Sequence, residues 1–102
     1  MIVWSKSAYA DLEKVAAFFK EQGNPELARK AVFYIGLTAE RLARFPLTGR
    51  KGRVKGTREL SMPKIPYLMV YASGKPNKLK IVRVLAADGP WPDFPASPER
   101  VK

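Results

Sequence analysis

The spacing of apolar residues predicts an amphipathic helix near the start of the chain. Its apolar stripe advances in steps of four, three and four residues and consists of Ala8, Leu12, Val15 and Phe19. Asp11 lies off this stripe. Ser5 or Ser7 provides an N-cap and the pattern ends near residues 22–23, so we expect a helix between these limits.

A second helix is expected after a very short link. Asn24 supplies an N-cap and Pro25 suits the first helical turn, whereas Pro46 ends the pattern. Steps of three and four residues define an apolar face made of Ala28, Ala31, Ile35, Thr38, Leu42 and Phe45. Because the link is so short, the two helices are predicted to form an antiparallel hairpin.

The remaining segments have the patterns of strands. Residues 2–4 are β-prone, and residues 57–62 alternate polar and apolar. Two further β-prone runs, joined by turn-forming residues, span 67–71 and 79–85. The order β-α-α-β-β-β predicts an α+β fold: an antiparallel sheet with the helical hairpin packed on one face. The 102 residues fit a single domain, with a proline-rich tail from about residue 88.

Composition excludes several kinds of chemistry. The chain has no cysteine and no histidine, which excludes thiol nucleophiles, histidine bases and Cys/His metal sites. Phosphate-binding glycine loops and paired carboxylates at helix spacing are also missing, so no metal and no cofactor are expected. The sequence has no apolar run near the ~20 residues of a membrane span and no signal-peptide pattern, so we expect a cytoplasmic protein without a membrane partner.

The chain is strongly basic, and the excess is concentrated in its second half. Its 19 Lys and Arg exceed its 9 Asp and Glu by ten charges. Residues 1–49 hold seven basic and five acidic residues, whereas residues 50–102 hold twelve and four. This asymmetry indicates an anionic partner such as nucleic acid, the ribosome or an acidic protein; a basic surface that only aids solubility is the alternative.

Candidate binding residues gather on a glycine-bearing loop that contains Arg50, Lys51, Arg53, Lys55 and Arg58. Such a loop can follow phosphates or bind an acidic chain, although solvated basic loops are common. Glu59 is expected to form a structural ion pair with Arg83 or Lys80, because its cationic neighbours make it a poor proton acceptor. Arg83 interrupts an apolar strand, so it is expected to reach solvent or meet a carboxylate. Trp91 is expected to hold the tail on the core, with exposure as a contact residue as the alternative.

Short motifs in a fixed order extend along nearly the whole chain. They include Val3, Trp4, Ser5, Ala8, Asp11, Leu12, Asn24, Pro25, Ala28, Leu42, Phe45, Pro46, Gly49, Arg50, residues 56–60, Pro66, Tyr67, Val70, Tyr71, residues 81–85, Trp91 and Pro92. In this arrangement the chain resembles the RelE/ParE superfamily of type II toxin–antitoxin toxins, a group also labelled plasmid stabilisation proteins. The resemblance implies a β-α-α-β-β-β fold, growth arrest, and neutralisation by a cognate antitoxin with which the chain oligomerises.

The resemblance allows two mechanisms. ParE-like toxins inhibit DNA gyrase without hydrolysis, whereas RelE-like toxins cut messenger RNA in the ribosome. Cleavage needs a base, an acid and cations, for which this chain offers Arg58, Arg83 and Glu59. Many relatives have a histidine where Ala86 stands, and arginine stays protonated, so gyrase inhibition is favoured. A weakly toxic, antitoxin-binding member is a third alternative.

Binding of the target or the antitoxin is then expected to use Arg50, Lys51, Arg53, Lys55, Arg58, Arg83 and Trp91. A toxin with a net charge of +10 is expected to pair with an acidic, partly disordered antitoxin segment, in an association that weakens with salt.

Overall fold

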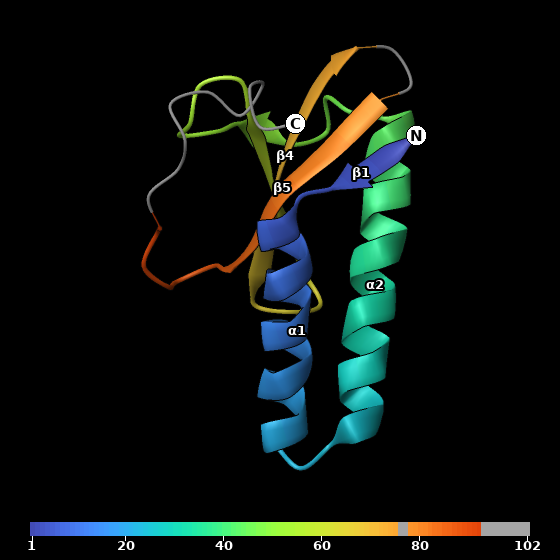
Figure 1. Cartoon of the computed structure of the whole chain (residues 1–102), viewed down its shortest axis with the longest axis vertical. Helices are drawn as coiled ribbons and strands as arrows, with labels where there is room; N and C mark the ends of the chain where they lie inside the picture. Colours follow the sequence, from blue (N-terminus) through green and yellow to red (C-terminus); the bar gives the residue numbers. More distant parts are fainter. Residues whose placement is uncertain (76–77, 93–102) are drawn as a thin grey trace.

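The computed structural model describes residues 1–75 and 78–92, so the expected tail is described only as far as Pro92 (Figure 1). Within these described residues, two helices and five strands follow one another. They are β1 (Ile2–Trp4), α1 (Lys6–Glu21), α2 (Pro25–Arg44), β2 (Arg50–Lys51), β3 (Arg58–Met62), β4 (Tyr67–Lys75) and β5 (Lys78–Ala86). Figure 1 shows α1 and α2 side by side, extending beyond the sheet at their connected ends.

Both helices begin at the predicted caps. The Oγ of Ser5 accepts a hydrogen bond from the amide of Ala8 at 3.0 Å, which fixes the start of α1. The side chain of Asn24 accepts from the amide of Leu27 at 3.0 Å, and Pro25 follows as the first residue of α2. Between the helices the backbone reverses at Gly23, whose φ of 82° is readily adopted only by glycine.

Phe45 does not belong to the apolar face of α2, contrary to the prediction. The helix ends at Arg44, and Phe45 is its C-cap, with a φ of −129°. Because the helical period stops there, the side chain leaves the buried face and is 61% exposed. The other predicted members of this face are buried, namely Ala28, Ala31, Ile35, Thr38 and Leu42.

The strands form one sheet in the order β1-β5-β4-β3-β2. The predicted α+β fold, with the helical hairpin on one face, is confirmed. The sheet is mixed, however, because β1 pairs parallel with β5 while the other neighbours are antiparallel. The whole hairpin separates β1 from the later strands, so no tight turn forces β1 to run against its neighbour. The additional strand β2 has only two residues, too few to give a periodic pattern.

Residues of the central strand β4 alternate between two apolar clusters. Met69 and Tyr71 face the helices and lie in the main core. Leu68 and Val70 face the opposite side of the sheet, where a smaller cluster also includes Val82 and Leu85. Trp91 packs against this smaller cluster, which confirms that it holds the described start of the tail against the sheet.

Candidate functional site

A network of hydrogen bonds fixes the beginning of the basic loop. The Tyr71 hydroxyl donates to the carbonyl of Pro46 at 2.7 Å and accepts from the amide of Gly49 at 2.9 Å. The Arg58 guanidinium donates to the carbonyl of Gly49 at 2.7 Å. A Cβ on residue 49 would lie 2.7 Å from both the Glu59 carbonyl oxygen and the Tyr71 hydroxyl, so this close approach requires glycine. Burial raises the pKa of Tyr71, which keeps its hydroxyl protonated as a donor.

Glu59 is a buried carboxylate around which the basic loop is arranged. Its side chain is 1% exposed and accepts hydrogen bonds from the Arg50 guanidinium at 3.0 Å and the Arg53 amide at 2.9 Å. The Nε of Arg53 lies 3.6 Å from the same carboxylate. The predicted ion pair with Arg83 or Lys80 is therefore wrong. β2 places Arg50 directly opposite Glu59 in the register, and this strand was not predicted from the sequence.

Four cations and one aromatic side chain form what we call the basic surface: Arg50, Lys51, Arg53, Lys55 and Trp91. Arg50 and Arg53 bind Glu59 on one side, yet their side chains remain 58% and 53% exposed. The Arg53 guanidinium carbon lies 3.8 Å from the centre of the Trp91 ring, a cation–π contact. Glu59 and Trp91 thus orient the two arginines, and Lys55 adds exposed charge on the same loop. Lys51 is also exposed, but it pairs with Arg58 in the register and therefore projects from the other face of this edge of the sheet. This arrangement can bind an anionic partner.

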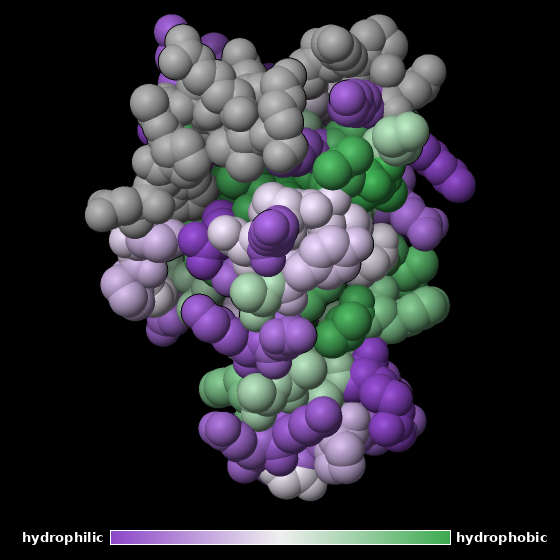
Figure 2. Space-filling view, viewed as in Figure 1, coloured by the Kyte–Doolittle hydropathy of each residue, from purple (hydrophilic) through white to green (hydrophobic). Residues whose placement is uncertain are grey.

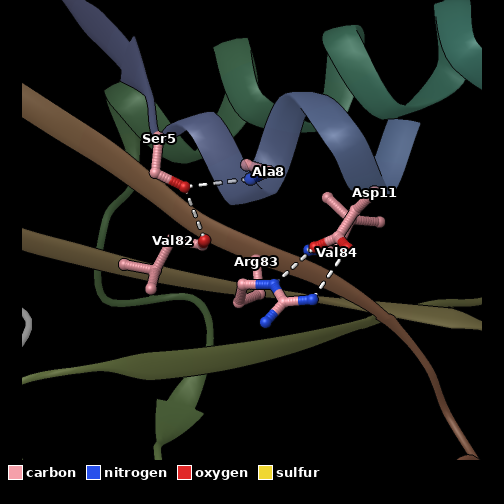
Figure 3. Close-up of polar contacts among 6 residues, drawn as sticks. All are labelled: Ser5, Ala8, Asp11, Val82, Arg83 and Val84. Atoms are coloured by element: carbon pink, nitrogen blue, oxygen red, sulfur yellow. Dashed lines mark hydrogen bonds and ion pairs between the residues drawn. The ribbon is translucent and has the colours of Figure 1, made fainter. Parts of the chain in front are cut away.

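Arg83 was expected either to reach solvent or to pair with a carboxylate, and it pairs with the carboxylate of Asp11 (Figure 3). Its Nε and one terminal nitrogen donate to the two oxygens of Asp11 at 2.7 and 2.9 Å. The same carboxylate accepts the backbone amide of Val84 at 2.9 Å. The hydrogen bond with Asp11 raises the pKa of Arg83 further above its usual value.

Asp11 is buried, although the sequence pattern placed it off the apolar stripe of α1. The spacing along the helix does indicate that Asp11 is buried, because it lies three residues after Ala8 and four before Val15, which are both buried. Its function in the fold is clear from Figure 3. β1 ends at Trp4, and beyond it α1 supplies hydrogen bonds to the edge of β5.

The first of these edge contacts comes from Ser5. Its hydroxyl donates to the carbonyl of Val82 at 2.8 Å, and its amide donates to the carbonyl of Ile81 at 3.0 Å. Asp11, which lies six residues after Ser5, then accepts a hydrogen bond from the Val84 amide. Ser5, the N-cap of α1, and Asp11 within α1 therefore continue the edge pairing that β1 begins.

The three residues proposed for RNA cleavage are used in three different contacts. Arg58 donates to Gly49, Glu59 binds Arg50 and Arg53, and Arg83 binds Asp11. Arg58 pairs with Tyr71 in the register and Glu59 with Val70, so the two side chains lie on opposite faces of the sheet.

Residues 1–75 and 78–92 lack two features that would indicate another kind of site. No group of three or more His, Cys, Asp or Glu side chains there could hold a metal ion. Neither helix in this part of the chain is long and apolar enough to cross a membrane.

Comparison with known proteins gives three consistent similarities. The family model described as "ParE toxin of type II toxin-antitoxin system, parDE" matches residues 2–91. A Sinorhizobium fredii protein named "Putative toxin Y4kP" is 35% identical over 91 residues, which cover 89% of this chain and 92% of that protein. A solved structure of a "Chromosomal ParDE TA system from P. aeruginosa" has a TM-score of 0.76 at 25% identity, covering 85% of this chain and 95% of that chain. The family match includes all helices and strands of the described residues and all of the basic surface.

Proposed function

The chain belongs to the ParE toxin family of type II toxin–antitoxin systems, and we propose that it arrests growth by binding DNA gyrase without cutting nucleic acid. Membership in this family supports an antitoxin partner. The choice of gyrase rests on the ParE-like character of the chain, and the basic surface is the proposed contact. In this proposal the chain is an inhibitor that acts by occupancy, with no catalytic residue.

The main support for this proposal is that the candidate cleavage residues already make contacts that stabilise the fold. Glu59 is almost completely buried beneath two arginines, and Arg83 is held by both oxygens of Asp11. A general base needs access to a substrate hydroxyl, and a cation that stabilises a phosphorane must reach it. Exposed cations remain available on the basic surface, which favours binding over hydrolysis.

The same surface offers a mechanism of neutralisation. An acidic antitoxin segment that covers Arg50 and Arg53 would exclude the target from them by direct competition. The association would weaken as salt screens the exposed charges, with a Debye length of about 8 Å at physiological ionic strength.

The test is inducible expression without antitoxin, scored for growth, DNA damage response and transcript integrity. We expect growth arrest, filamentation, a damage response and intact transcripts, and inhibited supercoiling when the purified chain is added to gyrase. Cut transcripts would overturn the proposal in favour of an RNA endonuclease. Normal growth, with folded protein verified in the cells, would overturn it in favour of a weakly toxic family member.

Two matched variants test the surface. Lys51→Glu with Lys55→Glu reverses two exposed charges at the basic surface, and Lys14→Glu with Lys20→Glu makes the same net change on α1. We expect only the first variant to lose gyrase inhibition. Equal loss in both variants would show that net charge, rather than this surface, matters.

A further inference from the structure

The outer side of α2 carries a regular row of exposed residues. Their spacing alternates between four and three, as in one seam of a coiled coil, and we call this row the outer seam: Glu26, Lys30, Phe33, Leu37, Glu40 and Arg44. At its centre Phe33 is 68% exposed and Leu37 48% exposed. Figure 1 shows α2 at the side of the molecule, and in Figure 2 apolar surface reaches that side over the middle of the helix. These two large apolar side chains give the outer seam an apolar centre on a face turned away from the core.

The outer seam is complementary to itself when its direction is reversed. Residues equally distant from position 35 form three matched pairs: Phe33 with Leu37, Lys30 with Glu40, and Glu26 with Arg44. The first pair is apolar, and each of the other two joins opposite charges. Two copies of α2 related by a twofold axis would bring these pairs into contact, because an isologous interface matches each position with its mirrored position on the other copy.

Gly36 is a second, independent observation at the same place. It lies in the middle of α2 beside Leu37, where glycine destabilises a helix relative to alanine. A Cβ built on Gly36 meets nothing within 4 Å, so packing inside this chain does not require glycine there. A missing side chain beside the centre of the seam lets another helix approach closely.

We propose that the outer seam is the contact for a second copy of this chain, with the two α2 helices antiparallel across a twofold axis. Phe33 then packs on the partner's Leu37, Lys30 meets the partner's Glu40, and Glu26 meets the partner's Arg44. Glu26 already contacts Arg29 of its own helix, in an exposed pair that leaves it accessible.

Charge explains why a second copy is the occupant. The chain has a net charge of +10, so two copies repel each other over most of their surface. The outer seam has two acidic and two basic residues and is neutral in sum. An acidic antitoxin segment matches the basic surface instead, and the seam lies on a different element of the fold.

The experiment measures the mass of the full chain by sedimentation equilibrium from about 1 μM to 1 mM, a range that spans weak to moderate association. We expect a monomer–dimer equilibrium for the natural sequence. Phe33→Glu with Leu37→Glu should weaken dimerisation by on the order of 100-fold, because both apolar contacts are lost at two symmetric places. The matched control, Leu47→Glu, removes a 73%-exposed leucine outside the seam and should leave dimerisation unchanged.

A charge exchange separates this contact from a general effect on folding. Lys30→Glu alone, or Glu40→Lys alone, places like charges together twice in the dimer and should weaken it about tenfold. The double exchange should restore dimerisation, although it improves no contact within the isolated helix. A monomer at every concentration, or a dimer unaffected by Phe33→Glu with Leu37→Glu, would overturn the proposal. Loss of antitoxin binding in that variant, with a natural chain that stays monomeric, would assign the seam to the antitoxin instead.

Discussion

Removal of the Asp11 carboxylate is the most informative test of how α1 is attached to the sheet. In Asp11→Ala three hydrogen bonds are lost at once, two from Arg83 and one from the Val84 amide. The Arg83 side chain is only 19% exposed, so its charge would remain largely desolvated without a partner. Loss of one partner of a buried pair costs about 3–5 kcal/mol. Because water still reaches part of Arg83, we expect a loss near the lower limit, about 3 kcal/mol.

The assay is urea unfolding monitored by circular dichroism, which gives the free energy of unfolding. In a thermal melt of a domain of this size, a loss of about 3 kcal/mol corresponds to a drop in Tm of roughly 12–24 °C. The matched control is Glu13→Ala, which deletes an exposed carboxylate two residues further along α1 and should change stability by about 0.5 kcal/mol or less. Asp11→Asn, which keeps an acceptor for the Val84 amide, should lose less than Asp11→Ala.

A double-mutant cycle isolates the pair itself. Asp11→Ala with Arg83→Met removes both charges, so the double variant should be considerably more stable than the sum of the single losses predicts. If Asp11→Ala were no more destabilising than Glu13→Ala, the Asp11 carboxylate would not attach α1 to the sheet as its hydrogen bonds indicate. Strict additivity in the cycle would equally show that the bidentate contact contributes nothing to stability.

The sequence was sufficient to predict the helices and strands whose formation depends on residues close together in the chain. Sixteen residues of α1 and twenty of α2 give many turns of one period, and Ser5, Asn24 and Pro25 mark their starts by local chemistry. β4 and β5 were equally recognisable from their apolar content. These predictions needed no knowledge of which segments meet in space.

The contacts of the charged residues could not be predicted in this way. Arg83 and Asp11 lie 72 positions apart, and their pairing depends on how α1 lies along the edge of β5. The partner of Glu59 depends on the register of β2, which is only two residues long. Sequence reasoning therefore located the basic loop correctly and predicted the wrong partner for the carboxylate at its centre.

Two further predictions concern the loop that carries the basic surface. Glu59→Gln keeps one acceptor for the Arg53 amide but loses the negative charge between two guanidinium groups. It should lower the free energy of unfolding measured with urea by about 1–3 kcal/mol and speed amide hydrogen exchange in residues 50–58. Unchanged exchange in these residues would show that Glu59 does not hold the loop. Tyr71→Phe should change the pH dependence of stability. Burial raises the folded-state pKa of Tyr71 above its ordinary value of 10.0, so the neutral hydroxyl stabilises the fold fully below pH 10 and this contribution is lost as pH rises through the folded pKa. The phenylalanine variant, which has no such proton to lose, should be less stable at neutral pH by about 1–2 kcal/mol and should decline less steeply above pH 10. Parallel alkaline declines in the two proteins would show that stability does not depend on the proton that Tyr71 donates to the Pro46 carbonyl.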